Sequence, residues 1–244
     1  MHRFFANPSV SDCNRFFLNN EDVFHAVRVL RLHPGDQAEI MFSGNRYLSQ
    51  INQISSDNVS LVPIKLLPST EPSLSITLFQ GLPKSDKMDF IIQKSVELGA
   101  VKIVPVIFSR SVIRLNDKDA EKKRDRWQKI ACEAGKQSGR CIIPEISPVC
   151  PVSNLNTHFS LCDKIVVPWE ECVEGGPLSF CRNNPGLSSL GIVIGPEGGI
   201  SADEMNGFLK YGCEAITLGK RILRTETAGL ASMSVFFGLY GEME

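Results

Sequence analysis

The first part of the chain, up to about residue 67, shows short runs in which apolar and polar residues alternate. A two-residue period is typical of strands that bury one face. The expected strands are 37–42, 46–54 and 58–66, with the hairpin turn Ser43-Gly44-Asn45 between the first two. An amphipathic stretch at 21–32 precedes them and predicts a helix. This part therefore indicates a small, mostly β module.

The pattern changes after residues 67–72, a polar segment with two prolines that is typical of a linker. Apolar strand-like runs then alternate with amphipathic helix-like ones. The expected strands are 75–81, 101–108, 164–169, 190–194 and 215–218, and the expected helices are 86–98, 118–137, 177–182, 202–211 and 225–240. Strands separated by helices need crossover connections, which favour a parallel sheet. We predict an α/β domain at 73–244 after a β domain at 1–70.

Composition agrees with a globular protein: 43% of the 244 residues are hydrophobic and 22% are charged. No apolar run approaches the length of a membrane span, and the segment after Met1 lacks the pattern of a secretory signal. We therefore expect a cytoplasmic protein that does not associate with a membrane. The 8 cysteines are scattered without a Cys-x-x-Cys pair, so we expect reduced thiols and no metal site.

Charge is unevenly distributed although the net charge is only -1. Residues 84–140 carry 14 Lys and Arg against 8 Asp and Glu, whereas 141–244 carry 6 against 12. A basic stretch inside a neutral protein can bind phosphates, because cations displace counterions from a polyanion. The lysines of 118–129 are typical of a solvated helix face. Basic residues at turns are better candidates: Lys84, Lys87, Arg110, Lys136 and Arg140.

Two glycine-containing turns, at 194–201 and 218–228, each follow an expected strand and lead into an expected helix. Parallel sheets bind ligands beyond the carboxyl ends of their strands, where loops expose backbone N–H groups and helix N-termini. The pair therefore predicts a ligand site. Ser201 and Glu204 form a capping box that starts the next helix. The first turn lacks the endings of a P-loop, a dinucleotide fingerprint and a serine-hydrolase elbow, which disfavours those classes.

The two turns, Ile194-Gly-Pro-Glu-Gly-Gly199 and Leu218-Gly-Lys-Arg-Ile-Leu-Arg-Thr-Glu-Thr-Ala228, resemble the RsmE family of 16S rRNA uridine-N3 methyltransferases, a branch of the SPOUT class. Further matches run along almost the whole chain, including residues 1–5, 93–99 and 137–140. The resemblance implies a C-terminal SPOUT α/β trefoil-knot domain after a small PUA-like RNA-binding β-barrel domain. It also implies a homodimer that methylates N3 of a specific uridine in 16S ribosomal RNA, free or within the small subunit.

By the same resemblance, S-adenosylmethionine is held by three loops and no metal takes part. The implied cofactor-binding residues are Val167, Pro168, Trp169, Ile194, Gly195, Pro196, Glu197, Gly198, Gly199, Leu218, Gly219, Arg221, Ile222 and Leu223. Glu197 and Glu226 are the carboxylates nearest this site, and Arg224 is suited to stabilise negative charge on a uracil carbonyl. The catalytic base is open among these residues, and Glu226 is equally suited to orienting a loop.

For RNA, the candidate phosphate contacts are Arg3, Arg28, Arg31, Lys84, Arg110, Lys136 and Arg140. The target uridine must leave its stack to expose N3. Two alternatives stay open at this stage. One is a SPOUT enzyme that methylates another target, such as a ribose 2′-oxygen. The other is a non-catalytic RNA-binding or assembly protein, for which intact glycine turns are unexpected.

Overall fold

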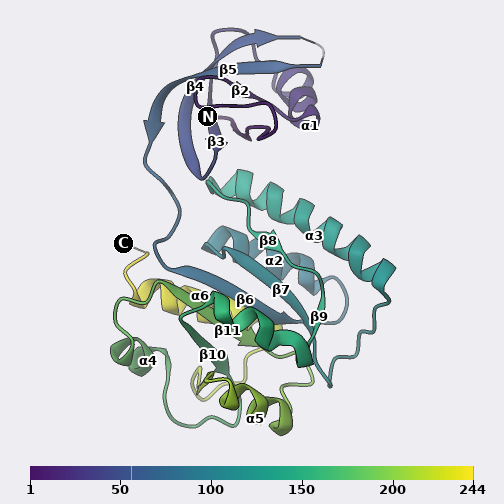
Figure 1. The fold of residues 1–244 in the computed structure, drawn as a ribbon, viewed down its shortest axis with the longest axis vertical. Coiled ribbons are helices and arrows are strands. Elements are labelled where there is room, and N and C mark those ends of the chain that lie inside the picture. Colours follow the sequence, from purple (N-terminus) through teal and green to yellow (C-terminus); the bar gives the residue numbers. More distant parts are fainter. Residues whose placement is uncertain (56, 244) are drawn as a thin grey trace. The chain divides into compact units, whose positions relative to one another are not determined.

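The computed structural model describes residues 1–55 and 57–243, and these divide into two compact units. Unit 1 comprises Met1–Glu71 and Gly135–Ile142, and unit 2 comprises Pro72–Ala134 and Ile143–Glu244 (Figure 1). The domain boundaries predicted from sequence put residues 135–142 in the second domain, whereas in the structure these residues belong to unit 1. Unit 1 is therefore discontinuous in the chain.

Unit 1 is built on a curled five-stranded sheet in the order β1-β3-β4-β5-β2. Its strands are β1 (Arg3–Phe5), β2 (Phe16–Phe17), β3 (Gln37–Phe42), β4 (Asn45–Ile54) and β5 (Val59–Leu67). The pairing shifts register twice between β4 and β5, and such bulges bend a sheet. Next to the two edge strands, Ala6 and Leu18 form an antiparallel bridge, which brings the sheet edges together. The unit is therefore a small half-barrel.

The helix expected at 21–32 forms as two shorter pieces, α1 (Asn20–Phe24) and the π-helical η1 (His25–Val29). Arg31 then takes a left-handed backbone conformation with φ of 53° and stops the helix. Val23 and Ala26 of this segment are buried, and they pack against Phe4, Phe16 and other apolar residues of the sheet. The amphipathic pattern thus predicted the buried face of the helix correctly, but it did not predict that the helix ends at Val29.

Residues 135–142 are tied to the rest of unit 1 by polar contacts. The Lys136 ammonium lies 2.7 Å from the carboxylate of buried Asp22. The Glu71 carboxylate accepts from the Arg140 guanidinium at 2.6 Å and from the backbone N–H of Cys141. These contacts join positions about seventy or more residues apart, so no local sequence pattern predicts them.

Unit 2 contains a seven-stranded sheet in the order β12-β10-β11-β6-β7-β8, with β9 also paired to β7. The strands are β6 (Ser75–Gly81), β7 (Lys102–Ile107), β8 (Glu145–Ile146), β9 (Cys150–Pro151), β10 (Lys164–Pro168), β11 (Ser189–Ile194) and β12 (Glu214–Ile216). Every pairing in it is parallel, as expected from the alternating pattern. The pattern missed the two-residue strands β8 and β9, which are too short to show a period.

Helices cover both faces of this sheet (Figure 1). They are α2 (Lys87–Leu98), α3 (Asp117–Ser138), the 3-10 helix η2 (Val152–Leu161), α4 (Pro177–Asn183), α5 (Ala202–Lys210) and α6 (Thr225–Leu239). Successive strand residues point to opposite faces, so Ile192 packs with α2 and α6 while Val193 packs with α5 and η2. Burial on both faces explains why the strands are continuous apolar runs.

Candidate functional site

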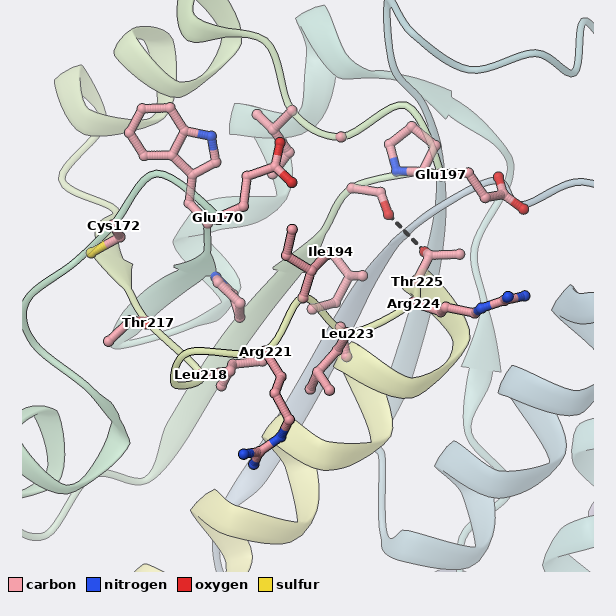
Figure 2. A pocket seen from close by; sticks show the side chains of 18 of the residues that line it. Glu170, Cys172, Ile194, Glu197, Thr217, Leu218, Arg221, Leu223, Arg224 and Thr225 are labelled. Atoms are coloured by element: carbon pink, nitrogen blue, oxygen red, sulfur yellow. Dashed lines mark hydrogen bonds between the residues drawn. The ribbon is translucent and has the colours of Figure 1, made fainter.

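A cavity of about 880 Å³ opens at the carboxyl ends of the neighbouring strands β10, β11 and β12. Most of its wall comes from three segments, the end of β10 with the residues after it, the loop after β11, and the connection from β12 to the first turns of α6 (Figure 2), and Lys87 of α2 completes it. In Figure 2, Glu197, Arg224 and Thr225 lie toward one side of this cavity, and Glu170 and Cys172 lie toward the other. The strand order therefore joins segments that are far apart in the sequence.

A chain of buried hydrogen bonds fixes the loop after β11. Thr225, the first residue of α6, donates from its hydroxyl to the Gly195 carbonyl oxygen at 2.7 Å (Figure 2). The same hydroxyl accepts from the side-chain amide of Gln80 at 2.9 Å, and Gln80 is fully buried in β6. One hydroxyl thus joins β6, α6 and the loop.

The loop also touches the end of β6 directly. A Cβ on Gly81 would lie 2.5 Å from the backbone nitrogen of Pro196, closer than any side chain allows. Gly199 ends the turn with φ of 72°, which favours glycine, and its N–H donates to the Pro196 carbonyl. The glycines therefore serve close approach and a left-handed turn.

Three charged side chains meet beside this loop. The Lys87 ammonium lies 3.4 Å from a carboxylate oxygen of Glu197 and 3.1 Å from one of Glu226. Burial alone would raise the pKa of the Glu197 carboxyl, but the backbone N–H of Lys84 and the Lys87 ammonium outweigh burial and lower that pKa. Hydrogen bonding to Glu226 and Glu197 raises the pKa of Lys87. All three groups therefore stay charged around neutral pH.

The helix that follows the loop is held by Glu204 of α5. Its carboxylate accepts from the backbone N–H of Ser201 at 2.9 Å, which completes the capping box expected from sequence, and from the N–H of Ser109 at 2.8 Å. Burial would raise the pKa of Glu204, but these two N–H donors and the Ser201 hydroxyl lower it. Glu204 thus ties the segment after β7 to the start of α5.

Nearly all of the expected cofactor residues line the cavity, and Val167 is the exception. Its side chain is fully buried and packs in the apolar cluster between the sheet and α5, because alternation along β10 turns it away from the cavity. Ile222 lines the cavity with 82% of its surface exposed. The assignment of these residues to cofactor binding stays a prediction.

Sequence reasoning missed several residues of the site. Thr217 and Thr225 line the cavity, and Gln80 and Gly81 support its wall. Lys87 also lines the cavity, although its position at a turn had indicated only a phosphate contact. Thr225 lies inside the quoted 218–228 segment, where a hydroxyl at the first position of a helix was an available signal. Gln80 and Gly81 in β6 carried no such signal, since only the order of strands in the sheet brings them to the cavity.

The three expected catalytic residues are placed differently. Glu197 and Arg224 line the cavity, whereas Glu226 does not and reaches the wall only through Lys87. Burial would raise the pKa of Glu226, but its own backbone N–H and the Lys87 ammonium lower it. Both roles considered for Glu226, the catalytic one and the orienting of a loop, stay predictions.

The expected RNA contacts divide by what their side chains already bind. Arg28, Arg31, Lys84 and Arg110 are exposed, and the Arg110 guanidinium donates to the carbonyl oxygen of Gly198 at 3.3 Å. Arg3 is half-exposed and pairs with Glu39 at 2.9 Å, and Lys136 is paired with Asp22. The expectation for Arg140 needs correction, because its side chain is buried and its guanidinium holds Glu71. Arg140 therefore stabilises unit 1 and does not present its charge to a nucleic acid.

Within residues 1–55 and 57–243, no group of three or more His, Cys, Asp or Glu side chains is arranged to hold a metal ion. Across the same residues, no helix has the length and apolar character needed to cross a membrane.

Comparison with known proteins identifies both units. Residues 70–237 match an RNA methyltransferase domain, and residues 18–64 match an RNA methyltransferase PUA domain. The ribosomal RNA small subunit methyltransferase E of Bacillus subtilis is 37% identical over 96% of this chain and 95% of its own length. The chain belongs to the ribosomal RNA small subunit methyltransferase E family. The enzyme of that name from Buchnera aphidicola is 33% identical over 96% of this chain and 92% of its own.

A solved methyltransferase E structure carries the comparison to the site. The crystal structure of the Neisseria gonorrhoeae enzyme bound to S-adenosyl methionine is 31% identical, with a TM-score of 0.81 over 98% of both chains. This agreement confirms the expected fold class, a PUA unit followed by a parallel α/β methyltransferase unit. The cavity of this chain lies at the carboxyl ends of the strands, where parallel α/β proteins bind ligands.

Proposed function

We propose that this protein transfers a methyl group from S-adenosylmethionine to N3 of a uridine in 16S ribosomal RNA. The observation that carries the proposal is a match over nearly the full length of the chain to methyltransferase E sequences and to a structure that binds S-adenosyl methionine. The cavity at the ends of β10, β11 and β12 supports it.

The cavity has the size and wall chemistry that this methyl donor needs. Its volume of about 880 Å³ falls within the range of small-molecule sites. Backbone groups of Gly195, Gly198 and Gly219 alternate on the wall with the apolar side chains of Leu218 and Leu223. Polar backbone edges suit adenine and ribose hydrogen bonds, and the aliphatic side chains suit the ring faces. We therefore assign binding of S-adenosylmethionine to the expected residues that line the wall.

When bound, S-adenosylmethionine supplies a methyl group already activated by its positive sulfur. The main task left to the protein is to align the acceptor and to help the N3 proton leave. The Glu197 carboxylate is held by the Lys84 N–H and the Lys87 ammonium, which makes it a weak proton acceptor suited to anchoring the loop. Arg224, exposed beside it, is the cation we assign to a uracil carbonyl that gains negative charge.

The proposal also covers how the protein contacts RNA and where and in what state it acts. The exposed side chains of Arg28 and Arg31 in unit 1, and of Lys84 and Arg110 in unit 2, contact RNA phosphates. The protein acts in the cytoplasm, where ribosomal RNA is made, as a homodimer. The trefoil knot implied by the family resemblance also stays a prediction.

A direct test uses purified protein, labelled S-adenosylmethionine and either bare 16S rRNA or small subunits from cells that lack the gene. Nucleoside mass spectrometry should find new 3-methyluridine, and R224A should make much less of it than the surface control K118A. A methyl group found on a ribose 2′-oxygen would show that the protein methylates ribose and not uracil N3. No transfer despite binding of the donor would refute the proposal, and no binding of the donor would favour an RNA-binding protein without catalysis.

A further inference from the structure

Lys87, which no sequence motif singled out as part of the active site, occupies a central position in it. Its side chain lines the cavity, and its ammonium bridges Glu197 on the wall and Glu226 behind it. Both carboxylates are mostly buried, with side chains 27% and 19% exposed. One cation between two such carboxylates removes a repulsion that would otherwise push them apart.

This contact joins three segments that the sequence separates widely. Lys87 begins α2, Glu197 lies in the loop after β11, and Glu226 lies in the first turn of α6. The turn before α2 is held at the same point, because Glu197 also accepts from the backbone N–H of Lys84. Ser85 in that turn has φ of 57°, a conformation that a non-glycine residue keeps only when its surroundings hold it.

We infer that Lys87 is a positioning residue for methyl transfer. It holds Glu197 and the loop after β11 in the orientation that the uracil, which accepts the methyl group, requires. This inference rests on the proposed function and deepens it. Glu226 supports the same arrangement from behind, by holding the Lys87 ammonium in place. Arg224 stands beside the three charges as the cation free to face the acceptor.

A stability role alone would predict a different outcome. Partly exposed ion pairs contribute about 0–1 kcal/mol to folding, so the loss of Lys87 leaves the protein folded. The donor-binding wall of Leu218, Leu223 and the loop glycines is built by the Thr225 and Gly81 contacts, which do not involve Lys87. Loss of Lys87 therefore lowers the rate of methyl transfer to the uracil more than it weakens binding of S-adenosylmethionine.

The test compares K87M with K87R and with K94M in the full-length protein. Lys94 lies on the same helix and pairs with Glu97 at its surface, so K94M is the matched control for loss of a lysine ion pair. We expect K87M to lower kcat by about tenfold or more, because small misplacements near the reacting atoms are costly. Affinity for S-adenosylmethionine, measured by calorimetry, should fall clearly less than kcat does. K87R should recover most of the loss, and K94M should match the wild type.

The pH–rate profile separates positioning from simple packing. The charged groups around Lys87 are Asp86 and Lys84 before α2, Glu197 after β11, and Arg224 and Glu226 at α6. Without the ammonium, the pKa values of Glu197 and Glu226 rise, so the acid limb of the K87M profile should move to higher pH. E226Q keeps the ammonium beside Glu197, so its acid limb should not move to higher pH, and a lower kcat in E226Q carries the test if K87M does not fold.

A K87M enzyme with wild-type kcat and an unchanged pH profile would overturn the inference. Equal losses of donor affinity and turnover that follow a lowered melting temperature would also overturn it, because they indicate a structural role only. These outcomes are distinct from failure of the proposed function, in which the wild type itself makes no 3-methyluridine.

Discussion

The hydroxyl of Thr225 donates to the carbonyl oxygen of Gly195 at 2.7 Å while accepting from Gln80. A single side chain at the start of α6 therefore sets the position of the loop after β11. The glycines of that loop allow many backbone conformations, and this contact selects one of them.

Replacing Thr225 with valine should weaken donor binding. The change keeps the shape but leaves the Gly195 carbonyl and the Gln80 amide without their partner, at a cost of about 1–3 kcal/mol each when buried. Urea unfolding and calorimetry with S-adenosylmethionine should both report losses, and T225S should restore them. T227V removes an exposed hydroxyl from the same turn and serves as the control. Wild-type affinity in T225V would show that the loop is held by other contacts.

Replacing Gly81 with alanine should displace the same loop by a different route. The new Cβ would meet the Pro196 nitrogen at 2.5 Å, and overpacking of this kind costs about 1–3 kcal/mol. We expect lower stability and at least a tenfold loss of donor affinity, about 1.4 kcal/mol. Gly207 in α5 has open space around it, so G207A should be neutral or slightly stabilising. Equal behaviour of the two variants would contradict this account of the close approach.

The stability of unit 2 should depend on pH through Glu204. Its pKa in the folded protein lies below the ordinary value of 4.5, so its contribution is fully present above that value and is lost as pH falls through the lowered folded pKa. The free energy of unfolding, measured from pH 7 to pH 3, should therefore differ most between wild type and E204Q at neutral pH. The difference should shrink in the acid range. D203N removes an exposed carboxylate from the same turn and controls for overall charge.

Arg28 and Arg110 should contribute to RNA affinity, and only Arg28 should do so without affecting the methyl donor, because Arg110 also contacts Gly198 of the cavity wall. Each alanine variant should bind 16S rRNA more weakly, and the dependence of log affinity on log salt should fall by about one unit per lost phosphate contact. Filter binding at several salt concentrations measures both quantities, with K118A as the control. An unchanged salt slope in R28A and R110A would remove these residues from the RNA surface.

Arg140 should behave in the opposite way. It is buried against Glu71, and removing one partner of a buried ion pair costs about 3–5 kcal/mol because the other charge is left unpaired. R140M should therefore unfold at a lower urea concentration. Exposed Arg28 offers the matched variant, since R28M should unfold as the wild type does. A stable R140M protein with weakened RNA binding would return Arg140 to the phosphate contacts.

The fold was predictable from sequence where the alternation of apolar and polar residues extends over enough positions to show its period. The runs that became β4, β5 and β6 showed their strands, and the Ser201–Glu204 capping box marked the start of α5. The two-residue strands β2, β8 and β9 were not predictable, because a pair of residues has no period. The π-helical end of the first helix was missed because Arg31 shows no helix-breaking chemistry.

The site was predictable where it consists of loops and not where it depends on the neighbours of those loops. The glycine turns indicated the cavity, since glycine marks close approach. Lys87, Gln80 and Gly81 lie on β6 and α2, and only the placement of β6 beside β11 brings them to the site. Arg140 was misassigned because a basic residue at a turn shows its charge in the sequence but not its burial.

Unit 1 needs residues 135–142, and the ribosome makes those residues only after β6, α2, β7 and most of α3. During synthesis, Asp22 and Glu71 must therefore wait for Lys136 and Arg140 while more than sixty residues emerge between them. A protein cut after residue 71 would expose the two acidic side chains, Asp22 and Glu71, that the whole chain neutralises. The N-terminal unit is thus begun first in the chain but completed only from within the following one.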